Sequence, residues 1–296
     1  MESKPIERAA VIGAGVMGAA IAAHLANAGI RTLLLDRQPT EPSEDERARG
    51  WGVDDPRVAT RIVRQGFDAA VRAKPAAFFD RRAVELVSLG TIDQDLDRLE
   101  EVDWVVEAVI EDLSIKQDVL VRIAPYLGLR TILTTNTSGL SIGQLSEALP
   151  AGVRPRFFAT HFFNPPRYLE LMEIVGGPES DPELIAGFRR FAEERLGKGV
   201  VVAKDTPNFI ANRLGVFALL DAMYRMLDTG LTVADVDALT GPLIGRPKSA
   251  TLRTADVVGL DTLSYVANGM ADRLDDDPDQ DRLRPPPLVR QLVEAG

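Results

Sequence analysis

The chain has 296 residues, of which 45% are hydrophobic, so it is long enough to form one large or two moderate domains with buried cores. Its 34 basic and 44 acidic residues give a formal net charge of −10, which excludes a general binder of nucleic acid or of anionic membrane surfaces. It contains no cysteine, which excludes disulfides, thiolate metal sites and a cysteine nucleophile. No run approaches the roughly 20 apolar residues that a bilayer crossing needs, and the first residues lack the apolar stretch of a signal peptide. We therefore expect a cytoplasmic protein with no metal site and no membrane insertion.

Short apolar, β-rich runs alternate with helical patterns through the first half of the chain. This alternation is typical of a parallel sheet with helices on both faces. The runs with strand character are residues 9–12, 32–36, 104–108, 131–135 and 156–161. Apolar residues at helical spacing fill 16–28 and 113–127, and a later helix over 181–197 precedes a strand at 199–202. The pattern predicts a doubly wound α/β domain.

Beyond Pro207 the hydrophobic pattern is helical only. The helical spacing covers residues 209–227, 233–239, 262–274 and 288–294. We therefore predict a Rossmann-like doubly wound sheet over residues 1–203, followed by a smaller all-helical domain over residues 204–296. Residues 38–56, with three prolines and dense charge, predict an exposed excursion from the first domain.

A glycine-rich loop follows the first predicted strand and opens the first predicted helix. Its sequence, GAGVMG, has the spacing GxGxxG. Gly13 permits a tight turn, Gly15 lets a pyrophosphate approach the backbone, and Gly18 lets the helix pack closely on the strand. Val16 and Met17 begin the helix, whose free N–H groups and positive dipole end favour phosphate binding. The loop therefore predicts a dinucleotide site.

The second predicted strand ends in an acidic residue, Asp36. A carboxylate at this place accepts hydrogen bonds from an adenosine ribose and repels a 2′-phosphate, which favours NAD over NADP. Arg37 follows directly and could counter that preference. A glycine turn without a ligand is the alternative, but the order of strand, loop, helix, strand and terminal acid disfavours it. His24 lies among alanines and leucines inside the helix, which favours a packing role.

A second histidine, His161, ends a predicted strand in the segment ATHFFNPP. A histidine there is well placed for proton transfer because its ordinary pKa lies near neutrality, although the spacing is equally consistent with a buried structural histidine. Two acids follow, Glu170 and Glu173; three residues apart on a strand they face opposite sides, so only one can face the histidine. The pattern does not decide which. The polar cluster 134–141, at the carboxyl end of another strand, lies where ligand groups are expected.

Six segments along nearly the whole chain share the motifs of one known family. They read VIGAGVMGAAIA, DWVVEAVIEDLSIK, TTNTSGL, THFFNPPRYLELMEI, GKGVVVAKDTPNFIANR and GRPKSATLRTADVVGLDTL. The sequence thus resembles the L-3-hydroxyacyl-CoA dehydrogenase family, and HFFNP and DTPxFIxNR are specific to it. It is similar to a bacterial branch in which this unit is joined to an enoyl-CoA hydratase domain. Asn208 stands where members commonly carry glycine.

The resemblance implies NAD-dependent oxidation of the 3-hydroxyl of L-3-hydroxyacyl-CoA to 3-ketoacyl-CoA in fatty acid β-oxidation. In this interpretation His161 is the catalytic base and Glu173 orients it. The family serine and asparagine near the reacting oxygen match Ser138 and Asn212. Glu170 falls where relatives usually carry lysine, a departure that we expect to concern the surface only.

The resemblance also implies which residues contact the cofactor and the substrate. Glu111 and Lys116 match the pair that lines the nicotinamide half of NAD, and Ser138 and Asn164 lie beside it. An acidic chain must meet the CoA phosphates with local bases, and the helical run 58–74 supplies four of them: Arg61, Arg64, Arg72 and Lys74. A solvated helix face explains that run equally well.

Members of the family continue past the position of Gly296 with a KTGxGF-like segment and further helices. The resemblance therefore implies a truncated helical domain that exposes apolar surface along Leu288, Leu292 and Val293. In relatives the helices beyond this point often make the dimer contact, so a homodimer through the helical domain is a further expectation.

Two other interpretations remain open. One is a dehydrogenase of a free hydroxy acid built on the same fold. The other is a truncated nucleotide-binding module with weak or no catalysis. The second is disfavoured because the chain keeps His161, Glu173, Ser138 and Asn212.

Overall fold

The computed structural model describes residues 5–274 and 277–295. The chain divides into two compact units, the first ending at Asp205 and the second beginning at Thr206. This division lies two residues beyond the predicted boundary between 203 and 204. The two units are described separately below.

The described part of the first unit is built on an eight-stranded sheet with the order β3-β2-β1-β4-β5-β6-β7-β8. All neighbouring strands are parallel except β6 and β7, which are antiparallel. The strands are β1 Arg8–Ile12, β2 Arg31–Asp36, β3 Val87–Thr91, β4 Trp104–Glu107, β5 Ile132–Thr135, β6 Phe157–Phe162, β7 Leu171–Gly176 and β8 Gly199–Ala203. This arrangement confirms the Rossmann-like doubly wound sheet.

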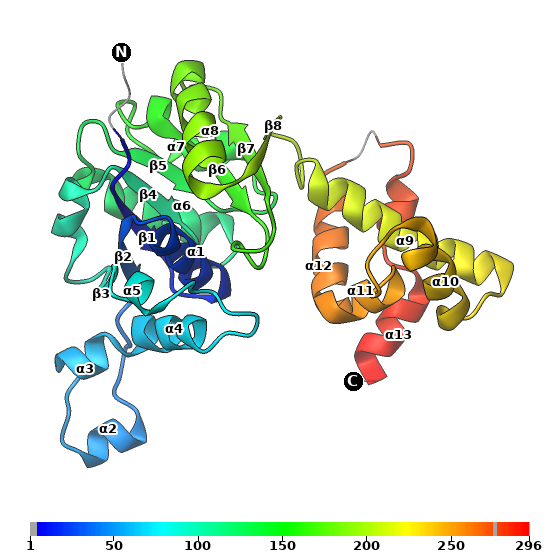
Figure 1. Cartoon of the computed structure of the whole chain (residues 1–296), viewed down its shortest axis with the longest axis horizontal. Coiled ribbons are helices and arrows are strands. Elements are labelled where there is room, and N and C mark those ends of the chain that lie inside the picture. The colour runs from blue at the N-terminus through cyan, green and yellow to red at the C-terminus, as the bar shows by residue number, and fades with distance from the viewer. Residues whose placement is uncertain (1–4, 275–276, 296) are drawn as a thin grey trace. The chain divides into compact units, whose positions relative to one another are not determined.

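Helices connect these strands and cover the sheet. They are α1 Val16–Asn27, α2 Glu44–Ala48, α3 Pro56–Ala59, α4 Arg61–Val71, α5 Arg81–Val84, α6 Leu113–Ile123, α7 Ile142–Glu147 and α8 Pro182–Leu196, with 3-10 turns η1 Leu96–Glu101, η2 Ala124–Tyr126 and η3 Arg154–Arg156. The helix predicted over 113–127 ends at Ile123, and the chain continues as the 3-10 turn η2, which contains Pro125. The segment 38–56 carries α2 and stands away from the rest of this unit, as predicted (Figure 1).

The inner strands are buried because both faces of the sheet are covered there. Helices α1, α4 and α8 share one continuous apolar core with alternate strand residues. At its centre Trp104 of β4 meets Phe188 of α8 edge-to-face, with ring centroids 4.9 Å apart. The intervening strand residues, such as Val105 and Leu133, are also fully buried. A sheet covered in this way leaves its strand ends as the place for polar chemistry.

Two strands, β3 and β7, are missing from the predicted runs, although Glu170 and Glu173 were treated as lying on a strand, and the absence of β3 has a physical reason. β3 is an edge strand with the sequence VSLGT, whose burial is partial and whose fourth residue is glycine. A half-exposed edge strand needs neither strict alternation nor a long apolar run. Its sequence therefore carries little strand signal.

The second unit is helical. Its helices are α9 Ala211–Thr229, α10 Val233–Thr240, α11 Leu252–Val258, α12 Leu260–Ala271 and α13 Pro287–Ala295, with 3-10 turns η4 Pro242–Ile244 and η5 Gln280–Leu283. Helix α11 was not predicted, because only Gly259 separates this short helix from α12. Helix α9 begins later than predicted because Asn208 and Phe209 have φ values of 60° and 53°. Such left-handed backbone favours glycine, and asparagine tolerates it better than most other residues.

The last described helix shows part of the expected apolar surface. On α13, Leu292 and Val293 are exposed, whereas Leu288 packs partly against the core of the unit. The expectation was therefore wrong for Leu288. In the described ranges no helix combines the length and hydropathy that crossing a bilayer requires.

His24 of α1 is a buried residue with a consequence for acid stability. It is 8% exposed and meets Phe162 edge-to-face at 6.1 Å between ring centroids. Burial, with a smaller contribution from the charge of Lys198, lowers the pKa of His24 to about 4. The imidazole of His24 therefore binds a proton near pH 6.5 in the unfolded chain but only near pH 4 in the folded chain.

We predict that His24 lowers the free energy of unfolding by about 3 kcal/mol as the pH falls from 6.5 to 4, because the unfolded state binds the proton at a higher pH than the folded state. His24→Leu should remove this component of the pH dependence. Urea unfolding of both proteins at pH 7, 5.5 and 4.5 measures it. Parallel pH dependences for the two proteins would show that His24 does not titrate in this range.

Candidate active site

The glycine loop between β1 and α1 has the geometry that a bound dinucleotide requires. Gly13 has φ +103°, and a Cβ there would lie 2.7 Å from the carbonyl oxygen of Ala108. A Cβ on Gly18 would lie 1.8 Å from the oxygen of Gly13, so helix and loop need both glycines to pack. A Cβ on Gly15 would enter open space. Packing thus explains two of the glycines, and access to the backbone explains the third.

The start of α1 is available to an anion. Gly15 is its N-cap residue and provides no side chain for its first-turn N–H groups. Val16, the first helical residue, is 76% exposed. Asp36, at the end of β2, lies against the loop: its Oδ2 accepts a 2.6 Å hydrogen bond from the Ala14 amide and its Oδ1 a 2.7 Å bond from the Arg37 amide. Loop, helix end and carboxylate together fit the pyrophosphate and ribose of a dinucleotide.

The antiparallel pairing of β6 and β7 places His161 directly opposite Glu173. His161 Nδ1 and Glu173 Oε2 are 2.8 Å apart, and the side chains are 5% and 1% exposed. Because a carboxylate only accepts hydrogen bonds, Nδ1 donates and Nε2 keeps the ring's lone pair. Glu170 precedes β7 and is exposed. Strand register therefore selects Glu173, the choice that the spacing left open.

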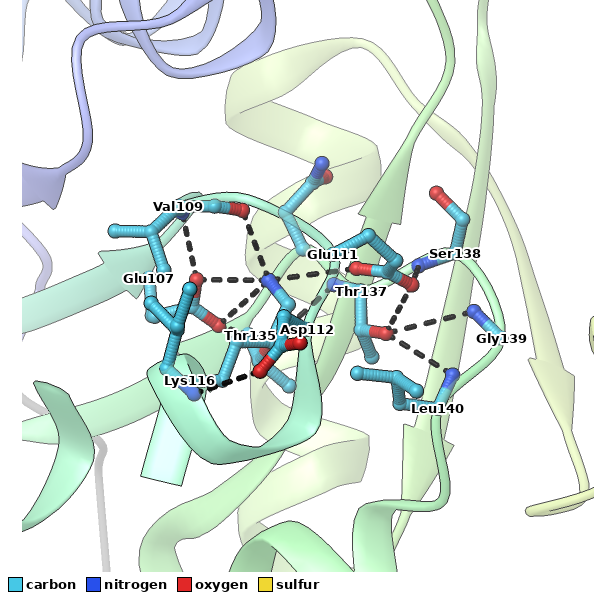
Figure 2. Close-up of polar contacts among 12 residues, drawn as sticks. Glu107, Val109, Glu111, Asp112, Lys116, Thr135, Thr137, Ser138, Gly139 and Leu140 are labelled. Carbon is cyan, nitrogen blue, oxygen red and sulfur yellow. Dashed lines mark hydrogen bonds and ion pairs between the residues drawn. The ribbon is translucent and has the colours of Figure 1, made fainter. Parts of the chain in front are cut away.

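A buried ion pair joins Glu107, the last residue of β4, to Lys116 of α6 (Figure 2). Lys116 Nζ is 2.8 Å and 3.1 Å from the two carboxylate oxygens of Glu107, and these side chains are 1% and 0% exposed. The lysine also donates to the carbonyl of Val109 at 3.1 Å. Glu107 in turn accepts bonds from the Thr135 hydroxyl at 2.5 Å and the Val109 amide at 2.6 Å. The pair is therefore well hydrogen-bonded on both sides.

Glu111 extends this network to the loop after β5. Its Oε2 is 3.4 Å from Lys116 Nζ. Its Oε1 accepts bonds from the Thr137 hydroxyl at 2.6 Å and from the Ser138 amide at 2.7 Å (Figure 2). Lys116 and Glu111 thus fix the backbone position of Ser138.

These residues gather at one edge of the sheet. The glycine loop, Asp36, Glu111, Ser138 and His161 follow or end β1, β2, β4, β5 and β6, and parallel strands present their carboxyl ends on the same side. That edge is where ligands bind in open α/β sheets. A cleft of about 1150 Å³ lies at the opposite edge, along the amino ends of β1, β2 and β3, and contains no residue of the candidate site.

The remaining predicted residues lie in the turn after β6, in the second unit, and on or near α4. Asn164 is exposed in the turn after β6. Asn212 lies in the first turn of α9, in the second unit. Among the bases proposed for CoA, Arg61 forms an ion pair with Glu46, so it already has a partner. The other three, on or just after α4, are exposed: Arg64, Arg72 and Lys74.

Two buried polar residues of the site were not singled out from the sequence. Glu107 ends the otherwise apolar strand WVVE, and a carboxylate closing a buried strand was the signal that could have found it. Asn136 accepts a 2.9 Å hydrogen bond from the Phe162 amide through Oδ1, which holds the end of β6 next to His161. Asn136 belongs to the polar cluster 134–141, although the pattern did not distinguish it from its neighbours.

A sheet of this order with a glycine loop at its first crossover is the architecture of dinucleotide-binding dehydrogenases. Comparison with known families makes the class specific. Residues 8–206 match the 3-hydroxyacyl-CoA dehydrogenase NAD-binding domain, and residues 209–296 match the C-terminal domain of the same family. The chain belongs to the 3-hydroxyacyl-CoA dehydrogenase family.

Individual relatives agree with this assignment. A probable 3-hydroxyacyl-CoA dehydrogenase of Bacillus subtilis is 43% identical over 293 residues, which are 99% of this chain and 37% of that protein. A putative fatty acid oxidation complex trifunctional enzyme of Rickettsia prowazekii is 32% identical over 280 residues, 94% of this chain and 37% of that protein. The chain thus spans little more than a third of these two relatives. The crystal structure of FadB2 of Mycobacterium tuberculosis has a TM-score of 0.78 and 32% identity, covering 99% of this chain and 95% of that one.

Proposed function

We propose that this chain catalyses the NAD-dependent oxidation of the 3-hydroxyl of L-3-hydroxyacyl-CoA to 3-ketoacyl-CoA, as a step of fatty acid β-oxidation. The observation that carries the proposal is the buried His161–Glu173 pair at the carboxyl edge of a dinucleotide-binding sheet. The family match supports NAD as the cofactor and an acyl-CoA as the substrate. A cytoplasmic location and a homodimer formed through the helical unit are parts of the same proposal.

His161 acts as the general base in this reaction. Its Nε2 accepts the proton of the 3-hydroxyl, because Nδ1–H is committed to Glu173. Glu173 fixes the tautomer and offsets the positive charge that the ring gains. A base of this kind contributes about 10²- to 10⁴-fold to the rate, and orientation of the reactants supplies much of the rest.

The cofactor is held by backbone and by charge. Gly13, Gly15 and Gly18 shape the loop, and the amides of Val16 and Met17 at the start of α1 would hold the pyrophosphate. Asp36 would accept hydrogen bonds from the adenosine ribose, while Glu111, Lys116, Ser138 and Asn164 would hold the nicotinamide half. Bound NAD supplies the acceptor for the hydride that leaves C3 of the substrate.

Ser138 and Asn212 position the reacting oxygen of the substrate. The Ser138 amide is fixed by Glu111, which leaves its side chain on an anchored backbone. Asn212 lies in the family motif at the start of α9, so its contribution depends on the second unit. Their roles rest on the family match to both parts of the chain.

The direct test is NADH formation, followed at 340 nm, from L-3-hydroxyacyl-CoA of several chain lengths and from the matching free 3-hydroxy acids. The proposal predicts turnover of the CoA thioesters and little or none of the free acids. Preference for a free acid would make the chain a dehydrogenase of that class instead. Absence of NADH formation from every substrate by folded protein that binds NADH would support a nucleotide-binding module without catalysis.

We predict that kcat/KM with NAD exceeds that with NADP by more than about tenfold, because a 2′-phosphate would meet the carboxylate of Asp36. Asp36→Asn should narrow this ratio, since it removes the charge and keeps an oxygen acceptor for the Ala14 amide. Initial rates with both cofactors measure it. Equal use of NAD and NADP by the unmodified chain would show that Arg37 dominates the site.

A further inference from the structure

Lys198 is a buried cation that the proposed reaction does not use. It follows Gly197, whose left-handed backbone (φ 64°) ends α8, and it directly precedes β8. Lys198 is 5% exposed, and its Nζ donates hydrogen bonds to the carbonyl oxygens of Pro166 and, at 2.9 Å, of Leu169. Both carbonyls belong to the segment 163–170, which we name the β6–β7 turn.

The surroundings of Lys198 offer it little charge compensation. Within the described ranges no ion pair joins Nζ to a carboxylate, and the ring centroid of Phe162 lies 5.5 Å from Nζ. Burial lowers the pKa of Lys198 to about 8, against the opposing charge of Glu170. Burying an ammonium group without an ion pair is costly, so the two carbonyls that accept its hydrogen bonds are its main compensation.

The β6–β7 turn is held from a second side by its own residues. Arg167 Nη1 donates to the carbonyls of Ala76 at 2.8 Å and Phe78 at 3.0 Å. The Tyr168 hydroxyl donates to the same Ala76 oxygen at 3.0 Å. Lys198 therefore binds the turn through its backbone carbonyls, and Arg167 and Tyr168 attach it to residues 76–78.

The turn joins the two strands that carry the proton-accepting pair. His161 lies near the end of β6, Glu173 near the start of β7, and Asn164 within the turn. The position at which the turn closes determines how these three residues are presented to a ligand. Two backbone carbonyls facing the interior cannot be satisfied by an apolar side chain, whereas a lysine ammonium has three donors on a flexible stem.

We propose that Lys198 is a positioning residue: by binding two carbonyls of the β6–β7 turn, it aligns His161 with Glu173 and places Asn164 at the cofactor site. The inference rests on the proposed function only for the catalytic meaning of that alignment. Small displacements of a reacting group cost large factors in rate, because about 1 Å can lower turnover 10²-fold. Loss of Lys198 therefore lowers kcat much more than it weakens binding of NADH, whose glycine loop lies on other elements.

The test compares Lys198→Met, which has no donor, with Lys198→Gln, which keeps an amide donor. Lys204→Met is the matched control, because Lys204 is an exposed lysine just beyond β8. We expect Lys198→Met to lower kcat at least tenfold with the dissociation constant of NADH changed less than twofold. Lys198→Gln should recover part of the loss, and Lys204→Met should match the unmodified protein. If Lys198→Met does not fold, the same comparison is made with Lys198→Gln.

A second readout does not need activity. His161 Nδ1–H donates a hydrogen bond to the carboxylate of Glu173, so the NMR resonance of this proton is expected far downfield. We expect the resonance to shift or broaden in the Lys198 variants but not in Lys204→Met. A lower melting temperature with kcat and this resonance unchanged would overturn the proposal and leave Lys198 a structural residue. The unmodified chain could also fail to oxidise acyl-CoA while the His161 resonance is present and still depends on Lys198. That result would overturn the proposed function and leave the positioning role of Lys198 intact.

Discussion

Replacement of His161 by alanine is expected to lower kcat for 3-hydroxyacyl-CoA oxidation by about 10²- to 10⁴-fold, the usual contribution of a general base. In the proposed reaction the ring receives the hydroxyl proton, and no water bound in its place has a pKa near neutrality. The glycine loop and Asp36 lie on other strands, so affinity for NADH is expected to stay within about twofold. Steady-state kinetics with NADH titration measures both quantities.

Glu173→Gln is the matched comparison for this variant. It keeps the size of the side chain but removes the charge that offsets the protonated ring, so turnover should fall by less than in His161→Ala. Circular dichroism and the melting temperature establish that both variants are folded. Near-unchanged kcat in a folded His161→Ala protein would mean that another group is the base.

The second large effect concerns stability. Lys116→Met is expected to lower the free energy of unfolding by about 3–5 kcal/mol, because it leaves the fully buried carboxylate of Glu107 without its cation. Affinity for NADH should fall as well, since Lys116 also contacts Glu111, which anchors the amide of Ser138. Urea unfolding and NADH titration measure the two losses.

The double variant Glu107→Gln, Lys116→Met separates the broken ion pair from lost packing. Removing both charges should restore part of the stability that Lys116→Met loses, since no unpaired buried charge remains. A double variant as unstable as the sum of the two single variants would show that the Glu107–Lys116 interaction contributes nothing of its own.

Local sequence patterns predicted most strands of the sheet and the glycine loop well. The glycine loop and the acid at the end of β2 follow one another at short range, and six predicted strands lie within about one residue of their observed bounds. Buried strands such as β1, whose last four residues are AAVI, read as short apolar runs. The edge strand β3 and the short helix α11 lack that signal.

Choices that depend on pairing between distant segments could not be predicted from spacing. Glu173 rather than Glu170 faces His161 because of the antiparallel register of β6 and β7, which spacing along one strand does not encode. The same holds for Glu107, whose partner Lys116 lies on the next helix, and for Lys198, whose partners lie about thirty residues earlier. The family resemblance identified Glu173, but it assigned no role to Glu107 or Lys198.

The most direct measurement of the central claim uses L-3-hydroxybutyryl-CoA that carries deuterium at C3. If the chain transfers a hydride from C3 to NAD while His161 accepts the hydroxyl proton, the NADH recovered carries the deuterium, and its formation slows in His161→Ala without loss of the label. Failure to form NADH from this substrate, or NADH that is unlabelled while the deuterium appears in water, would contradict the account.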